Sequence, residues 1–219
     1  QGRRPGIISR GYGGKNQSPM LVEEGSDPAI VGDEPLMMAN ETEVPVVCCR
    51  DRSLAAQFLV DHANCDVIIS DDGLQHYQLR RDFEIAVIDG ARGFGNGLLL
   101  PAGPLREPVA RLSDVDAVLV NGIDRWGVAP ERATSFSLIP EALIDAKTRQ
   151  SISIKQIAKK RVRAVAGIGN PKRFFETLRD LGALVIEHPW PDHAPLSDDD
   201  LQFGDDLAIV ITDKDFHRC

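Results

Sequence analysis

Short apolar runs rich in β-branched residues recur along the first part of the chain, and they most constrain its fold. They lie at 6–9, 44–49, 66–70, 84–89 and 116–121. Helical segments separate several of them, including residues 53–63, which Ser53 is expected to cap. Continuous apolar strands separated by helices are typical of a parallel sheet with both faces covered. The predicted fold is therefore α/β, with a mostly parallel, doubly wound sheet.

The run at 66–70 ends in polar groups. It is followed directly by Asp71-Asp72-Gly73-Leu74-Gln75-His76. A buried strand that delivers carboxylates at its C-terminal end is the usual way an open α/β sheet presents a metal or phosphate site. The same residues also fit a tight Asp-Asp-Gly turn after a core strand. On this segment alone, both interpretations stay open.

A glycine cluster and a helix start precede this run. Gly11, Gly13 and Gly14 permit close backbone approach to a ligand, and Arg10 and Lys15 supply positive charge for an anionic one. The cluster is not a Walker A loop, which requires Ser or Thr after its lysine, and a flexible surface turn is the alternative. Further on, Gly32-Asp33-Glu34-Pro35 is expected to open a helix, with Asp33 where an N-cap would stand.

A loop rich in glycine and proline spans residues 90–108, after the expected strand at 84–89. Ordered loops of this length in compact domains are usually functional. Arg92, Arg106 and Glu107 are therefore candidates for ligand contacts. A structural loop held by salt bridges is the alternative.

The chain turns polar and basic between residues 139 and 161, which suggests a domain boundary. We expect a core at 1–145, a linker at 146–161 and a smaller C-terminal α/β domain at 162–219. That domain is predicted to contain a β-α-β unit, with strands at 162–166 and 183–186 around a helix at 172–181. A last strand at 208–211 leads into Thr212-Asp213-Lys214-Asp215, another set of polar groups at a strand end.

Composition excludes several classes of protein. The formal net charge of −8 argues against a general nucleic-acid binder, which needs a positive field. The four cysteines show no zinc-ligand spacing and are expected to be reduced thiols of a cytosolic protein. No apolar run is long enough to span a bilayer, and no signal peptide is visible. The chain begins at Gln1 and ends at Cys219, which suggests a fragment cut at both ends.

Several long motifs stand in an order that resembles a known family. They are Ser9-Arg10-Gly11-Tyr12-Gly13-Gly14, Gly32-Asp33-Glu34-Pro35, Asp71-Asp72-Gly73-Leu74-Gln75-His76, the segment from Asp89 to Glu107, Ala166-Gly167-Ile168-Gly169-Asn170-Pro171 and Pro191-Asp192-His193. Together they are similar to the tetraacyldisaccharide 4'-kinases of lipid A biosynthesis. The resemblance runs from Arg4 almost to the end of the chain.

The resemblance implies a P-loop-NTPase-like kinase that uses ATP and Mg²⁺ to phosphorylate the 4'-hydroxyl of an acylated glucosamine disaccharide. It also implies a monomer, peripheral to the cytoplasmic face of the bacterial inner membrane, that binds no nucleic acid. The implied metal ligands are Asp71 and Asp72, and the implied catalytic pair is Asp33 as base with His193 as its partner. Gln75, His76, Arg106 and Glu107 would contact the nucleotide, and Arg10, Tyr12, Arg92 and Asn96 the disaccharide.

The sequence departs from the family pattern in places. The family's Walker A loop and hydrophobic N-terminal helix lie upstream of the motif at Ser9, and neither is present here. We therefore expect the full-length protein to be the kinase and this chain alone to be inactive or nearly so. Ala194 replaces a usual histidine, and Asp213 a usual glutamate. Two other functions are considered, a non-catalytic module that binds glycolipid or nucleotide and a metal-dependent phosphohydrolase.

Overall fold

The computed structural model describes residues 2–11, 17–192, 194 and 196–217. It divides the chain into two compact units, one formed by residues 1–73 with 140–219 and the other by 74–139. This partition differs from the predicted one, in which 146–161 is a linker and 162–219 a separate domain. The predicted linker contains a strand and a 3-10 helix, and its Ile157 is buried in a hydrophobic core. The predicted domain arrangement stays a prediction.

The first unit contains a four-stranded sheet with the order β2-β3-β1-β4. Its strands are β1 (Pro5–Ser9), β2 (Met20–Val22), β3 (Val46–Cys48) and β4 (Val67–Ser70). β1 pairs in parallel with both β3 and β4, whereas β2 is antiparallel to β3. The carboxyl ends of β1, β3 and β4 therefore meet at one edge of the sheet.

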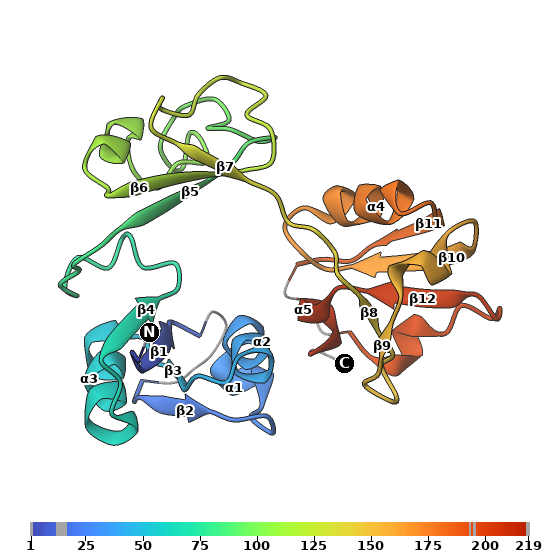
Figure 1. The fold of residues 1–219 in the computed structure, drawn as a ribbon, viewed down its shortest axis with the longest axis horizontal. Coiled ribbons are helices and arrows are strands. Elements are labelled where there is room, and N and C mark those ends of the chain that lie inside the picture. The colour runs from blue at the N-terminus through green and yellow to red at the C-terminus, as the bar shows by residue number, and fades with distance from the viewer. Residues whose placement is uncertain (1, 12–16, 193, 195, 218–219) are drawn as a thin grey trace. The chain divides into compact units, whose positions relative to one another are not determined.

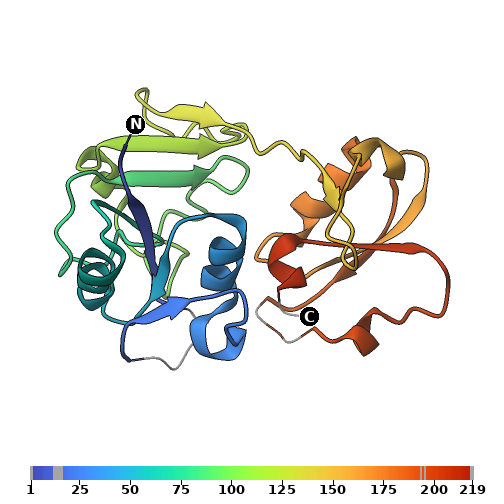
Figure 2. The same ribbon diagram turned by 60° about the horizontal axis from the view of Figure 1, so that its bottom comes forward.

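Helices cover both faces of this sheet. They are α1 (Pro28–Val31), α2 (Asp33–Glu41) and α3 (Arg52–Ala63). The chain moves to one side of β1 through α2 and to the other through α3, and right-handed crossovers then place the two helices on opposite faces. Figures 1 and 2 show α2 and α3 on opposite sides of the strands. The sheet is accordingly doubly wound, as predicted.

Two predicted helix caps are wrong. The N-cap of α3 is Asp51, whose side chain accepts hydrogen bonds from the backbone N–H groups of Ser53 and Leu54. Ser53 instead lies in the first turn, because Asp51 stands earlier and also satisfies the free N–H groups there. The N-cap of α2 is Gly32, at φ 93°, and Asp33 is the first helical residue. The Asp33 carboxylate is therefore not used as a conventional cap.

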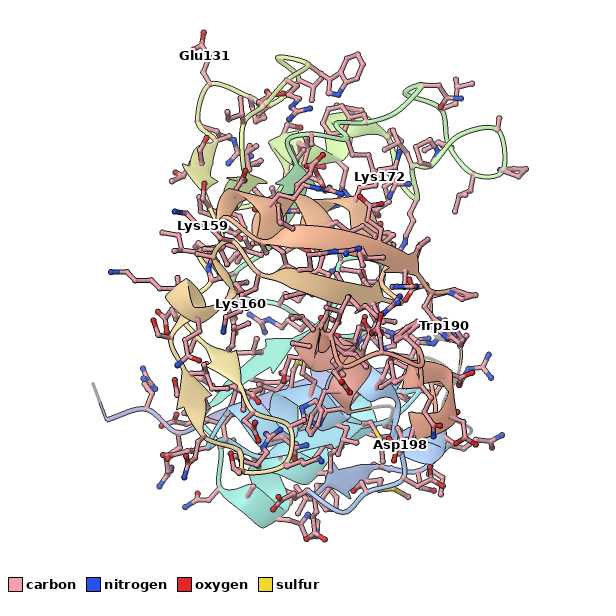
Figure 3. All side chains as sticks on the ribbon, turned by 90° about the vertical axis from the view of Figure 1, so that its right-hand side faces the viewer. Glu131, Lys159, Lys160, Lys172, Trp190 and Asp198 are labelled. Atoms are coloured by element: carbon pink, nitrogen blue, oxygen red, sulfur yellow. The ribbon has the colours of Figure 1, made fainter. Side chains whose placement is uncertain are left out.

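The rest of the first unit, residues 140–219, contains a parallel sheet with the order β11-β10-β12. The elements of this segment are β8 (Leu143–Ile144), β9 (Ser151–Ile152), η2 (Ile154–Ile157), β10 (Arg161–Ala166), α4 (Pro171–Asp180), β11 (Leu184–Pro189), η3 (Asp198–Leu201), β12 (Ala208–Ile211) and α5 (Asp213–Phe216). Phe175 and Leu178 of α4 pack on Val162 and Ala164. The predicted β-α-β unit is therefore present. Figure 3 shows Lys160 and Trp190 at opposite ends of this sheet.

The second unit is built on a parallel sheet with the order β5-β6-β7. Its elements are β5 (Ile85–Asp89), the 3-10 helix η1 (Val109–Ser113), β6 (Ala117–Asn121) and β7 (Thr134–Phe136). Ala86, Ile88, Val118 and Val120 form its core. The sequence predicts β5 and β6 but not that they form a sheet of their own.

The predicted α/β class, with mostly parallel strands, is confirmed. The period and composition of the apolar runs identify the strands, while the partition into sheets depends on pairings between distant segments. Among the described residues, every helix is too short or too polar to cross a bilayer.

Candidate functional site

The carboxylates Asp71 and Asp72 lie at the carboxyl end of β4, as predicted. The backbone N–H of Asp71 donates to the carbonyl oxygen of Ile8, which continues the pairing of β4 with β1. Ser9, the last residue of β1, donates its hydroxyl hydrogen to Asp71 Oδ2 over 3.2 Å. Asp71 is half-buried, while Asp72 is exposed. The sheet edge thus presents one hydroxyl and two carboxylates.

An arginine that the sequence does not single out fixes this turn. Arg52, which is only 6% exposed, donates from Nη2 to the carbonyl oxygens of Asp71 and Asp72, over 2.9 and 3.0 Å. Gly73 also shapes the turn, because a Cβ there would lie 2.5 Å from Ser70 Oγ. These contacts therefore hold the backbone that carries the two carboxylates. Nothing in the spacing between Arg52 and Asp71 predicts this contact.

Replacing Arg52 by alanine should destabilise the first unit. Hydrogen bonds from a charged donor contribute about 1.5–3 kcal/mol, and the carbonyl groups would lose their partner. We expect Arg52→Ala to lower the free energy of unfolding in urea by roughly 2–3 kcal/mol. Arg50→Ala is the matched control, because Arg50 is exposed and its loss should change stability by less than about 0.5 kcal/mol. Equal stability of the two variants would refute the role of Arg52.

A second group of charges surrounds Lys214 of α5. Its Nζ lies 3.0 Å from Glu34 Oε1, 3.7 Å from Asp33 Oδ2 and 3.4 Å from Asp192 Oδ1. Asp33 is buried, and its Oδ1 accepts a hydrogen bond from the Glu34 backbone N–H. One ammonium group therefore joins the start of α2 to the segment around Asp192.

The surroundings of Lys214 keep it charged. Burial lowers the pKa of its ammonium group, but the hydrogen bond to Glu34 and the charges of Glu34, Asp33 and Asp192 outweigh burial, so the pKa is raised overall. The neighbouring Asp215 is fully buried and accepts hydrogen bonds from the Gly167 N–H and the Thr212 hydroxyl. These bonds anchor α5 to the turn after β10. The polar motif after β12 was a sequence signal for this arrangement, although its role was not predicted.

The charge of Glu34, which lies beside Lys214, affects the carboxyl group of Asp71 at the sheet edge. Burial raises the pKa of the Asp71 carboxyl above its ordinary value. The Ser9 hydrogen bond and the Arg52 charge lower it, whereas the negative charges of Glu34 and Asp72 raise it, and the net shift is upward. Burial, the largest cause, therefore outweighs the Ser9 hydrogen bond and the Arg52 charge. A divalent cation at this edge would favour the charged form of both carboxylates.

Four predicted nucleotide contacts lie in the second unit. Gln75 joins two of the others, because its Nε2 donates to Glu107 Oε2 and its Oε1 accepts from Arg106 Nη1, both over 3.1 Å. The Nε2 atom of His76 is buried and has no hydrogen-bond partner among the described residues. The structure thus brings Gln75, Arg106 and Glu107 together within this unit.

The predicted disaccharide contacts are more scattered. Asn96 stabilises its own loop, since its Nδ2 donates to the Ala102 carbonyl oxygen and its Oδ1 accepts from the Leu98 N–H. Arg92 and Arg10 have exposed side chains. Tyr12 and His193 lie outside the described residues. All these contacts stay predictions.

These features define an α/β protein of the open, mostly parallel class, with a carboxylate site at the carboxyl edge of its first sheet. The family model described as LpxK, tetraacyldisaccharide-1-P 4'-kinase, matches residues 1–219. The chain belongs to this family.

Individual relatives agree with the family match. The tetraacyldisaccharide 4'-kinase of Alkalilimnicola ehrlichii is 50% identical over 227 residues, covering 100% of this chain and 65% of the relative. That of Hahella chejuensis is 46% identical over 220 residues, covering 100% and 64%. A crystal structure of LpxK from Aquifex aeolicus in complex with ATP is similar at a TM-score of 0.78 and 27% identity, covering 99% of this chain and 70% of that one. The chain thus spans about two thirds of the length of the curated relatives it matches.

Proposed function

We propose that the protein containing this chain transfers the γ-phosphate of ATP to the 4'-hydroxyl of the tetraacyl glucosamine disaccharide in lipid A biosynthesis. Family membership supports the reaction class. The structural observation that carries the proposal is the cluster at the sheet edge. There Asp71 accepts a hydrogen bond from Ser9, Asp72 follows it directly, and Glu34 is close enough for its charge to raise the pKa of Asp71.

The residues at this edge fit Mg²⁺. Carboxylate and hydroxyl oxygens are the ligands that Mg²⁺ prefers, and Asp71 and Ser9 supply both kinds at this edge. Asp71 and Asp72 would hold the ion, directly or through water. A bound Mg²⁺ neutralises negative charge that develops on the phosphoryl group during transfer. Arg52 supports the site by holding the backbone of both residues.

Asp33 is the proposed general base. Its carboxylate is buried at the first position of α2 and is not required as a helix cap. A positioned carboxylate can accept the proton of the attacking hydroxyl, and Lys214 restrains Asp33 from the other side. Asp192, the residue before His193, also forms an ion pair with the Lys214 ammonium group. This shared partner supports the proposed pairing of His193 with Asp33.

The proposed binding residues form two sets, one for the nucleotide and one for the disaccharide. Gln75, Arg106 and Glu107 form a linked polar group suited to a nucleotide, with His76 beside it in sequence. Arg10, Tyr12, Arg92 and Asn96 are proposed to contact the disaccharide. The protein is proposed to act as a monomer on an acylated substrate at the cytoplasmic surface of the inner membrane.

The test is transfer of labelled γ-phosphate from ATP to the lipid by the full-length gene product, with Mg²⁺ present. We expect a labelled lipid with the free 4'-hydroxyl acceptor and none with an acceptor already phosphorylated at that position. Phosphate release from ATP that is independent of lipid would instead support a phosphohydrolase. Binding of lipid or ATP without any turnover would support a non-catalytic module.

A further inference from the structure

Three potential metal ligands gather where α2 meets α5. One ligand atom each from Glu41, Asp213 and His217 lies within 4.8 Å of the others. Glu41 is the last residue of α2, while Asp213 begins α5 and His217 follows its last residue. Asp213 and His217 are four residues apart, so that one helical turn brings their side chains to the same face. The cluster therefore joins two segments that are distant in sequence.

The imidazole of His217 lacks a partner on the side that faces this cluster. Its side chain is only 6% exposed, and among the described residues its Nε2 atom has no hydrogen-bond partner. The nearest carboxylate oxygen, Asp213 Oδ2, is 3.7 Å away, which is too far for a hydrogen bond. A buried polar atom without a partner is costly, and such atoms often mark an ion or water that completes the site.

Asn40 gives a second, independent indication. Its side-chain amide contacts the opposite ring nitrogen, His217 Nδ1, with 3.0 Å between Asn40 Nδ2 and Nδ1. The other amide atom, Asn40 Oδ1, is buried and has no hydrogen-bond partner within the described chain. Rotating the amide by half a turn would present Oδ1 to an Nδ1–H group. A histidine bound to metal through Nε2 usually has this arrangement, with its other N–H donated to an oxygen.

We propose that Glu41, Asp213 and His217 bind a divalent transition-metal ion of the zinc type, with Asn40 orienting the histidine. An imidazole ligand favours Zn²⁺ over Mg²⁺, which prefers oxygen ligands alone. One nitrogen and two carboxylates suit a tetrahedral site whose fourth position is water. Ligand bonds of about 2.0–2.2 Å require ligand atoms roughly 3.4 Å apart. Glu41 and Asp213 have exposed side chains that can rotate to close that gap.

The ion would connect the end of α2 to α5. Asp33 begins α2, and Lys214 of α5 already lies 3.7 Å from it. Metal binding at the far end of α2 would add to this ion pair and to the contact between Asn40 and His217. The site uses none of the groups assigned to phosphoryl transfer, and its existence does not depend on the proposed kinase activity.

Calorimetric titration of the 219-residue chain with ZnCl₂ tests the site. We expect one Zn²⁺ to bind per chain, and MgCl₂ at the same concentration to give no comparable binding. His217→Ala should abolish saturable Zn²⁺ binding, whereas His62→Ala, which removes an exposed histidine of α3, should leave it unchanged. Equal affinity of the His217→Ala variant and the unaltered chain would overturn the proposal.

The His217→Ala variant could fail to bind Zn²⁺ simply because it does not fold, so two further variants test the site. Asp213→Asn changes a side chain that is 47% exposed, so the fold should persist while Zn²⁺ binding weakens. Asn40→Leu removes the orienting amide and should weaken binding by about 10- to 100-fold. Circular dichroism confirms folding of each variant. If both folded variants bind Zn²⁺ as tightly as the unaltered chain, the proposal fails.

Co²⁺ substitution distinguishes this site from the cysteines. A site of nitrogen and oxygen ligands gives visible d–d bands without a thiolate charge-transfer band in the near ultraviolet. We expect the d–d bands in the unaltered chain and their loss in the Asp213→Asn variant. A charge-transfer band would place the ion on a cysteine and would overturn the assignment.

Discussion

Replacing Asp33 by asparagine in the full-length protein is expected to lower kcat by about 10²-fold or more, with a much smaller change in KM. General base catalysis by a positioned side chain typically contributes about 10²–10⁴-fold. The structure strengthens this expectation because Gly32, not Asp33, is the N-cap of α2, so that capping does not explain the acidic group. The measurement is the steady-state rate of lipid phosphorylation at saturating ATP and Mg²⁺.

The control for Asp33→Asn is Asp61→Asn. Asp61 is an exposed residue of α3 whose Oδ1 accepts a hydrogen bond from Gln57, and asparagine retains that acceptor. The control should have normal turnover. Thermal unfolding of both variants checks that they are folded. Near-normal turnover of a folded Asp33→Asn variant would remove Asp33 from the mechanism.

Replacing Asp71 by asparagine is expected to lower turnover and raise stability. Loss of one metal ligand should reduce kcat by roughly 10²-fold or more, because charge stabilisation by the metal contributes several kcal/mol. The required Mg²⁺ concentration should also rise. Turnover measured as a function of Mg²⁺ concentration tests both effects.

The stability gain follows from the direction of the pKa shift. Burial raises the pKa of Asp71 above 3.8, so in the window between the unfolded and folded pKa values the folded protein binds more protons than the unfolded one. Stability therefore falls as the pH rises through that window. Asparagine cannot ionise and avoids this cost. In buffer without Mg²⁺, Asp71→Asn should have a higher Tm than the unaltered chain at pH 7, and the difference should shrink as the pH falls towards 3.8.

The matched control is Asp66→Asn, at the opposite end of β4. Its Oδ1 accepts a hydrogen bond from the Arg4 backbone N–H over 2.7 Å, and asparagine can accept the same bond. Turnover and its Mg²⁺ dependence should be unchanged in this variant. A folded Asp71→Asn protein that keeps normal turnover at low Mg²⁺ would exclude Asp71 as a metal ligand.

Local sequence patterns predict much of the fold. The strand at 66–70 and the helix at 53–63 are within one residue of β4 and α3. The apolar runs identify these elements because alternation and length are properties of the segment itself. The cap at Ser53 is wrong because Asp51 competes for the same N–H groups. Three-residue strands such as β2 and β7 are too short to produce a periodic signal.

The candidate site is predicted less completely, for a related reason. Asp71 and Asp72 stand in a local motif at the end of a strand, which is why the sequence points to them. The catalytic role of Asp33 comes only from the resemblance to the kinase family, because its local pattern indicates a helix start. Arg52 and Lys214 act on groups that are 19 and 180 residues away in sequence, and no local pattern encodes those contacts. The partition of the strands into separate sheets is likewise decided by pairing between distant segments.

The ion pair between Lys214 and Glu34 has a consequence for how the protein is made. The two residues are 180 positions apart, and synthesis proceeds from the N-terminus at about 5–20 residues per second. Glu34 and Asp33 therefore leave the ribosome about 10 to 40 s before Lys214 does. Throughout that interval the carboxylates of Asp33 and Glu34 lack the Lys214 ammonium group that lies beside them in the folded protein. The ion pairs around Asp33 and Glu34 can therefore form only after Lys214 has been synthesised.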